Sequence, residues 1–274
     1  MSRFASYSKP LSACSLFLFA ALLSCPLSRA EESPWDKMAS YGFNDARREF
    51  KKDPSREGRF GEAIALLNVQ PRSVDNINKA LEIVTQLAAE NSTDNVGALS
   101  QYYVGRINHF HYDQVEKDKA LDAYRKALSL HSGNPLVENA AASIVGLEVH
   151  DAPKDLNRFQ TLQNLEPLVA ELKSPIGRRD FHLAMGNAYL EFADINDAKS
   201  RQNAVRHLLE AEKLGITRWQ VEVNVWVAIA EASRANNDKK TALEYYNKFL
   251  GKYTRDRRAH LISLRVAELQ KGGK

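Results

Sequence analysis

One pattern constrains this chain more than any other: a small residue followed by a large apolar one returns about every forty positions. The copies begin at residues 80, 120, 161, 204 and 242, so the successive steps are 40, 41, 43 and 38 residues. They read Ala80-Leu81, Ala120-Leu121, Thr161-Leu162, Ala204-Val205 and Ala242-Leu243. A near-constant period of this size is typical of repeat architectures, in which each unit packs against its neighbours along the chain.

Each copy continues with apolar residues on one helical face. An aromatic residue stands four positions on, as Tyr124 does after Ala120 and Tyr246 after Ala242. Residues four apart lie on the same side of an α-helix. The small side chain lets a neighbouring helix approach, and the aromatic ring fills the space one turn later. We therefore predict that each copy is the second helix of a helical pair, and we find no strand pattern beside it.

A first helix is predicted before each of these. Its mark is a small residue at matching phase, which is Gly105, Gly146, Gly186 and then Ala230. Glycine inside a helix costs about 1 kcal/mol relative to alanine. Its recurrence at one place predicts a tight helix crossing where a larger side chain would not fit.

These residues carry a family resemblance. A large residue, then Leu-Gly or its equivalent, then an aromatic, and then alanine, aromatic and alanine resembles the tetratricopeptide repeat. The last copy fits without a gap, through Trp226, Ile229, Ala230, Ala242, Tyr246 and Phe249. The resemblance covers roughly residues 57–269, but the repeats are longer than the family's period of about 34 residues. The extra length leaves the exact register and the curvature open.

The resemblance implies an all-α fold, a right-handed superhelical array (α-solenoid) of about five antiparallel helix pairs. A further helix with Leu261, Leu264 and Leu269 on one side is predicted to cap it at the C-terminal end. The repeat domain is assigned to residues 57–274, after a partly helical N-terminal extension over 31–56. The first helix of the first copy is expected over 62–68, and Pro167 is expected to kink or begin its helix.

Residues 1–30 are predicted to be a cleaved signal peptide. Arg3 and Lys9 precede an apolar stretch over 11–23, and Ser28-Arg29-Ala30 places small residues at the cleavage positions. The apolar stretch is shorter than the roughly 18 to 20 residues that span a bilayer, which disfavours a retained membrane anchor. Cleavage after Ala30 would export the chain to the bacterial periplasm or beyond.

A competing interpretation concerns the same segment. Leu22-Leu23-Ser24-Cys25 resembles a bacterial lipobox, in which the cysteine is lipidated and becomes the new N-terminus. Pro26 directly after it fits poorly. Both interpretations predict an exported protein, and membrane attachment is expected only if Cys25 is lipidated.

Charge and cysteine content exclude several classes of function. The chain has 38 basic and 34 acidic residues. Without 1–30, which holds three basic residues and no acid, the balance is 35 to 34. A polycationic nucleic-acid binder is therefore not expected. Both cysteines, Cys14 and Cys25, lie in the signal segment, so the chain cut after Ala30 has no disulfide, thiol nucleophile or cysteine-bound zinc.

Catalytic motifs are missing. We find no H-E-x-x-H, no G-x-S-x-G and no glycine-rich phosphate loop. His109-Phe110-His111, with Asp113 nearby, is an incomplete metal-ligand set. We therefore expect no metal, no cofactor and no enzymatic activity. A wall-active enzyme on a helical array is the alternative, and it would need a buried acid in a cleft.

In the family that the chain resembles, the first helices line a concave face that takes a peptide or a partner helix. The resemblance implies that the lining here is Tyr102, Arg106, His109, Ser143, Leu147, His150, Leu183, Asn187, Leu190, Val227, Glu231 and Arg234. Of these we predict as binding residues Tyr102, Arg106, His109, Asn187, Glu231 and Arg234. Their mixed polarity suits a protein or peptide partner. The sequence thus predicts an interaction scaffold of the bacterial cell envelope, and it carries no signal for an oligomeric state.

Overall fold

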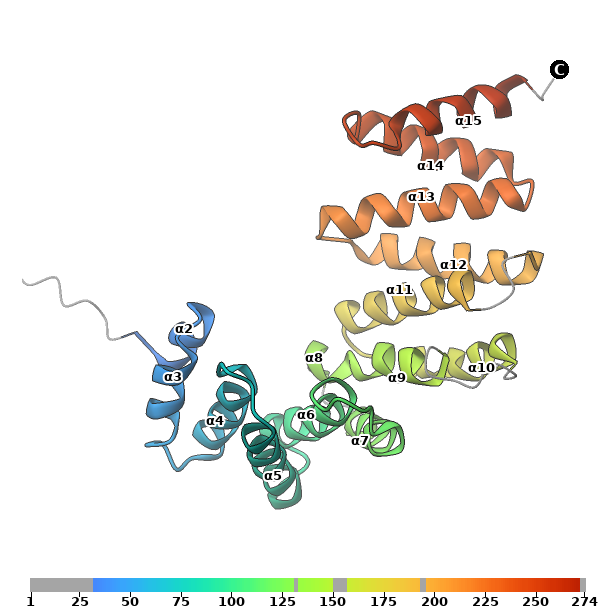
Figure 1. Ribbon diagram of the computed structural model, residues 1–274. Helices are drawn as coiled ribbons and strands as arrows, with labels where there is room; N and C mark the ends of the chain where they lie inside the picture. The colour runs from blue at the N-terminus through green and yellow to red at the C-terminus, as the bar shows by residue number, and fades with distance from the viewer. Residues whose placement is uncertain (1–31, 131–132, 150–156, 193–195, 272–274) are drawn as a thin grey trace, which may run out of the picture.

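The computed structural model describes residues 32–130, 133–149, 157–192 and 196–271. In these residues every regular element is a helix and no strand occurs (Figure 1). The predicted all-α class is confirmed. The predicted signal peptide over 1–30, with Cys14 and Cys25, and the predicted groove residue His150 lie outside the described residues.

Helix pairs follow one another along the described chain. Their first members are α4 (Arg56–Asn68), α6 (Asn95–Phe110), α8 (Pro135–Glu138) with α9 (Ala140–Val149), α11 (Pro175–Glu191) and α13 (Trp219–Ala235). The second members are α5 (Val74–Glu90), α7 (Lys117–Ser129), α10 (Arg158–Leu165) with the 3-10 helix η1 (Glu166–Glu171), α12 (Ala198–Leu214) and α14 (Lys239–Lys252). A last helix, α15 (Ala259–Lys271), packs on α14 as predicted, but its buried residues are Ile262 and Val266, whereas Leu261 and Leu264 of the predicted face are exposed.

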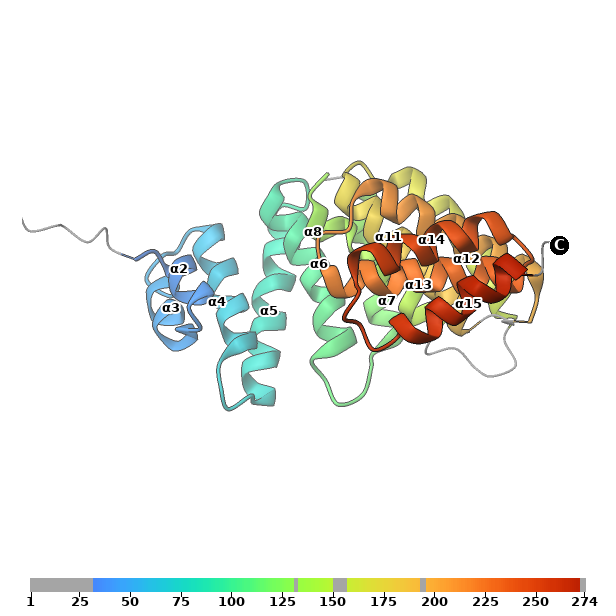
Figure 2. The same ribbon diagram turned by 90° about the horizontal axis from the view of Figure 1, so that it is seen from above.

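The pairs are stacked in series, as predicted for a helical solenoid. Most helices pack mainly on the helices before and after them in the chain, but α9 packs mainly on α7 and α11. Figure 1 shows an N-terminal arm, α2 to α7, and a C-terminal arm in which α11 to α15 lie in successive layers; the stack bends between them at α8 and α9. Figure 2 shows the two arms from above, with the N-terminal helices at one end.

Two short helices precede the first pair. They are α2 (Pro34–Ala39) and α3 (Phe43–Phe50), and both contact α4. Ser33 and Asp36 form a reciprocal cap at the start of α2. A Cβ on Gly61 of α4 would overlap the Phe50 ring, so α3 approaches α4 as closely as helices within a pair approach each other. The α2–α3 hairpin therefore extends the stack at its N-terminal end.

The first repeat is better formed than its sequence indicates. Helix α4 begins at Arg56, six residues before the expected start at Glu62. Its N-cap is Ser55, whose side chain accepts a hydrogen bond from the backbone N–H of Gly58. The cap fixes a polar first turn that apolar periodicity alone does not reveal.

Small residues stand at the helix crossings, as predicted, in two of the three glycine-bearing pairs. A Cβ on Gly105 would lie 2.6 Å from Tyr124 Cδ1, and one on Gly186 would lie 2.7 Å from Leu208 Cδ2. Both partners stand four residues after the repeated small residue of the second helix. The close crossing thus requires a large side chain on one helix and hydrogen on the other.

The prediction is wrong at Gly146. A Cβ there would meet no atom of the described residues within 4 Å, the backbone of its own helix turn aside. The reason is that the second helix of this pair is interrupted: α10 ends at Leu165 and Pro167 stands in the first turn of η1. Leu165 is buried but does not reach the Gly146 position. Pro167 does begin a helix, as one of the two expectations for it stated.

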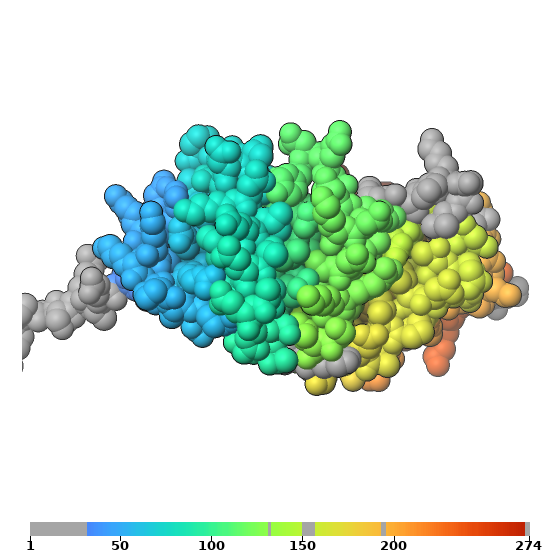
Figure 3. Space-filling model, turned by 90° about the horizontal axis from the view of Figure 1, so that it is seen from below, coloured from blue at the N-terminus to red at the C-terminus, as the bar shows by residue number. Residues whose placement is uncertain are grey.

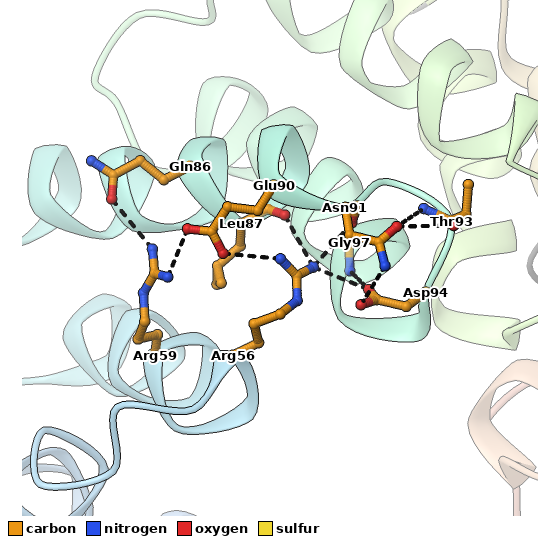
Figure 4. A network of polar contacts seen from close by, with 9 residues as sticks. All are labelled: Arg56, Arg59, Gln86, Leu87, Glu90, Asn91, Thr93, Asp94 and Gly97. Atoms are coloured by element: carbon orange, nitrogen blue, oxygen red, sulfur yellow. Dashed lines mark hydrogen bonds and ion pairs between the residues drawn. The ribbon is translucent and has the colours of Figure 1, made fainter.

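Polar contacts fasten the first two pairs together (Figure 4). The Arg56 guanidinium donates to the backbone oxygens of Leu87 and Asn91, at 3.1 and 3.0 Å. It also pairs with the carboxylates of Glu90 and Asp94, at 3.0 and 3.1 Å. Asp94 in turn caps α6. One side chain of α4 therefore holds the end of α5 and the start of α6 in place.

Candidate functional site

A hollow of about 560 Å³ opens between the first helices of three successive pairs. We call it the central hollow. It lies at α6, α9 and α11, at the bend of the array, and it is open to solvent. Its lining is His109, Phe110, Val115, Ala142, Ser143, Val145, Gly146, Val149, Ala184, Asn187, Ala188, Glu191 and Phe192.

Small residues make the space. Ala142 and Gly146 are four apart on α9, and Ala184 and Ala188 are four apart on α11. Residues at this spacing lie on one helix face. Two faces without long side chains therefore meet at the central hollow. The volume left between them is open because the side chain that fills the crossing at Gly105 and at Gly186 has no counterpart at Gly146 among the described residues.

Large apolar side chains border the same space. Phe110 is 53% exposed and Val115 is 44% exposed, although both are hydrophobic. The Phe110 ring is held from two sides: the His109 ring stacks on it with centroids 3.7 Å apart, and the Arg106 guanidinium carbon lies 5.6 Å from its centroid. An apolar hollow with exposed large side chains at its border is the usual form of a docking site for an apolar ligand group.

Polar groups in the hollow are few. His109 Nδ1 lies 3.3 Å from the hydroxyl oxygen of Tyr124, whose pKa is raised by burial. Ser143, Asn187 and Glu191 supply a hydroxyl, an amide and a carboxylate. These groups are suited to orient a ligand by hydrogen bonds while the apolar lining takes its side chain.

Three predicted groove residues meet in the central hollow. His109, Ser143 and Asn187 come from three different helices and all line it. Arg106 does not line it but supports Phe110 at its edge. For Tyr102 and Leu147 the prediction is wrong, because both side chains are fully buried. The Tyr102 ring packs inside the second pair, 5.8 Å from the ring of Tyr124.

The remaining predicted residues lie elsewhere. Arg234 pairs with Glu231 on the same helix, at 3.1 Å, and Arg265 of the capping helix binds the other oxygen of Glu231 at 2.9 Å. This cluster joins α13 to α15 and shares no residue with the central hollow. The others are half-buried apolar residues that pack against the C-terminal core: Leu183, Leu190 and Val227.

Sequence reasoning missed part of the site. Phe110 stands among the closely spaced aromatics Tyr102, Tyr103 and Tyr112, which cannot all point inward at helical spacing, and this signal could have placed it at a surface. Phe192 and Val115 carry no such signal. The repeat pattern predicts a close helix crossing at Gly146, whereas Gly146 lines the hollow. The two kinds of glycine look alike in sequence.

A buried polar network joins the third and fourth pairs. His182 Nδ1 and His207 Nδ1 are 2.8 Å apart, and His207 Nε2 lies 2.9 Å from a Glu166 oxygen. Burial opposes ionisation of Glu166, but His207 and Arg206 outweigh it and lower its pKa to about 2. Burial lowers the pKa of His182 to about 4. His207 is fully buried, and through it the network links η1, α11 and α12.

In the part of the chain that the structure describes, no three His, Cys, Asp or Glu side chains converge on one point, the His109–His111 segment included. Burial, with Arg72 and Arg106 nearby, lowers the pKa of His111 to about 4. Among the described helices none combines the length and apolar character of a membrane span.

Two solved structures share this kind of helical arrangement at low sequence identity. No protein-family model matches the chain, and no curated protein sequence matches it. Among solved structures, a chain of the APC/C hetero-tetramer Cut9–Hcn1 is similar with a TM-score of 0.47 and 17% identity, over 92% of this chain and 46% of that one. The TPR2AB domain of yeast Sti1, solved in complex with pHSP90, gives a TM-score of 0.32 and 14% identity, over 87% of this chain and 96% of that one.

The described chain is a tetratricopeptide-like helical array. Its helix pairs pack in series, and small residues stand at two of their crossings. The chain spans less than half the length of the Cut9–Hcn1 chain that it resembles.

Proposed function

We propose that this protein is a non-enzymatic scaffold that holds a peptide segment of a partner protein in the central hollow. The single observation that carries the proposal is an open apolar hollow where the repeat pattern elsewhere places a packed helix crossing. Helical repeat arrays use surfaces formed by successive first helices for binding, and this hollow joins three of them.

The lining defines the chemistry of the ligand. A floor of alanines and glycine with Phe110 and Phe192 beside it suits one large apolar side chain. Asn187, Ser143 and Glu191 lie at the same hollow and are suited to bind the peptide backbone or a cation next to the anchor residue. A peptide that places one aromatic or branched aliphatic residue between polar ones therefore fits best.

A hydrolytic function is less favoured. In the described residues Glu191 is the one carboxylate that lines the central hollow, whereas glycoside hydrolysis usually uses two. The buried acid Glu138 accepts hydrogen bonds from the backbone N–H groups of Lys173 and Ser174, at 2.7 and 2.9 Å. Glu138 thus fastens the start of α11 and is engaged structurally.

The cellular setting is part of the proposal and is supported by the sequence alone. The apolar stretch over 11–23 and the small residues before Glu31 indicate export, in the style of a bacterial signal. The alternative is a lipid-anchored envelope assembly factor attached through Cys25. The mass of the mature N-terminus distinguishes the two, since cleavage gives a free Glu31 and lipidation gives an acylated Cys25.

The test fills the hollow without disturbing the fold. We expect Gly146→Leu to weaken binding by about 10- to 150-fold, because the loss of one buried apolar anchor is worth roughly 1.5–3 kcal/mol. Gly251→Leu is the matched control: Gly251 is also helical, and a Cβ there also meets no atom of the described residues within 4 Å. The readout is photo-crosslinking in the native envelope from a reactive residue at position 187.

The two variants together decide whether the central hollow is the binding site. The proposal is supported if the crosslinked partner disappears with Gly146→Leu and persists with Gly251→Leu. A crosslink that survives both substitutions would show that the hollow is not the binding site. A reactive residue at exposed Asn247 on α14 should give no product of the same mass.

A further inference from the structure

The N-terminal hairpin carries a basic face that the proposed scaffold function does not use. Asn44, Arg47, Arg48 and Lys51 follow one another at steps of three, one and three residues, which places them on one side of α3. The four residues together line a shallow depression in the surface. Lys52 follows directly in the sequence. We call Arg47, Arg48, Lys51 and Lys52 the α3 basic face.

Most of this charge is not compensated within the described chain. Arg48 pairs with Asp45 on the same helix, and both side chains are largely exposed. Arg47, Lys51 and Lys52 form no ion pair with any described residue. Lys51 and Lys52 are exposed. The face therefore presents cations to solvent on one side of a segment whose total charge is balanced, since residues 31–56 hold six basic and six acidic residues.

An aromatic residue in an unusual backbone conformation stands beside it. Tyr41 is 82% exposed and has a φ of 65°. A bulky residue in the left-handed region is uncommon, and such outliers concentrate at functional positions. Its ring contacts that of Phe43, with centroids 5.9 Å apart. Asn44 lines both the depression that holds Tyr41 and Phe43 and the one that holds the basic residues, so the two surfaces are continuous.

The position of the hairpin adds a geometric argument. It is the first described element and lies at the end of the array opposite α15 (Figure 1). Figure 3 shows its residues, in blue, forming one end of the molecule. Residues 26–32 separate Cys25 from the cap of α2 at Ser33. Even fully extended, a segment of that length reaches about 25 Å.

We infer that the α3 basic face, together with Tyr41, docks on an anionic phospholipid surface. Basic side chains are attracted to anionic lipid, and tyrosine is favoured at the depth of the headgroups because its ring is apolar and its hydroxyl is polar. The central hollow begins at α6, one helix pair beyond the hairpin, and shares no residue with the α3 basic face. A lipid on Cys25 would reinforce the contact, since the short tether holds this end of the array at the bilayer.

The experiment uses the processed protein and vesicles of defined composition. Vesicles of phosphatidylglycerol and phosphatidylethanolamine should bind the protein, and vesicles of phosphatidylcholine should not. The triple substitution Arg47→Gln, Lys51→Gln, Lys52→Gln should lower the partition coefficient about a hundredfold, because each basic side chain near an anionic surface contributes about a fivefold gain. Binding should also fall as salt is raised.

Two further variants make the test specific. The triple substitution Lys240→Gln, Arg255→Gln, Arg257→Gln removes the same charge from exposed residues at the C-terminal end and should leave vesicle binding unchanged. Tyr41→Gly removes the ring while suiting the left-handed backbone, and it should weaken binding without loss of stability. A fluorescence change of Trp35, in the same hairpin, reports the contact.

The inference is overturned by any of three results. These are no binding to anionic vesicles at low salt, equal loss of binding with both triple variants, or binding to soluble polyglutamate but not to vesicles. The last result would assign the face to an acidic protein. None of these results bears on the central hollow, which the crosslinking variants test separately.

Discussion

The packing argument is tested most directly by adding one methyl group at two glycines that look alike in sequence. At Gly186 the new Cβ would lie 2.7 Å from both Cγ and Cδ2 of Leu208 and 3.3 Å from the backbone oxygen of Ala204. Leu208 is fully buried, so it cannot turn aside into solvent. At Gly146 the new methyl would meet no atom of the described residues within 4 Å.

The two substitutions share one contribution to the free energy of unfolding and differ in a second. Replacing a helical glycine by alanine stabilises a helix by about 0.5–1 kcal/mol, and this gain applies to both positions. Overpacking a filled core costs about 1–3 kcal/mol, and this penalty applies only to Gly186→Ala. Subtracting the two measurements cancels the helix term. We therefore expect Gly146→Ala to be more stable than Gly186→Ala by about 1–3 kcal/mol.

The assay is chemical denaturation followed by far-UV circular dichroism, with a thermal melt as a second measurement. Gly146→Ala should match or exceed the parent protein, with a rise in Tm of about 2–4 °C for each kcal/mol gained in a chain of this size. Gly251→Ala, in an exposed helical position, sets the scale of the shared helix term. Equal stabilities of the Gly146 and Gly186 variants would refute the claim that Gly186 marks a filled crossing and Gly146 an open one.

Two further predictions concern the contacts between pairs. Arg56→Ala removes the side chain that binds the end of α5 and the start of α6. In the same denaturation assay we expect it to lower the free energy of unfolding by about 1–3 kcal/mol, which is more than Arg59→Ala should. Similar small losses for both variants would show that Arg56 does not hold α5 and α6 in place. His182 has its pKa lowered by burial from its ordinary 6.5 to about 4, so the unfolded chain takes up this proton first and stability falls as the pH drops from 6.5 to 4. His182→Gln should reduce that slope, and an unchanged slope would show that His182 is not its source.

Much of the fold could be predicted because its determinants are local in sequence. The buried alanines at 80, 120, 204 and 242 stand where the repeat pattern places a helix contact. Thr161 is the exception: it is only half-buried, and the buried residue there is its neighbour Leu162. That copy is also the one whose second helix is interrupted, so the copy that begins with Thr instead of Ala is the irregular pair in the structure.

The candidate site could be predicted only in part. The predicted groove residues His109, Ser143 and Asn187 all line the central hollow, and their role in binding stays a prediction. The predicted helix face was harder to assign than the helix itself. Successive residues are rotated by about 100° around the helix axis, so an error of one residue in register moves a side chain from surface to core. Tyr102 shows this: it was assigned to the groove, and it is fully buried.

The sequence by itself determined the helices, their pairing and their order in the stack, because helix formation and contacts between consecutive helices depend on residues that are near one another along the chain. Only the tertiary structure decided where space remains. Gly105, Gly146 and Gly186 are the same residue at the same phase, yet a side chain fills the crossing at the first and third, and no side chain of the described residues does so at the second. Whether a glycine is covered depends on the position of a different helix, and that position is set by packing across the whole pair.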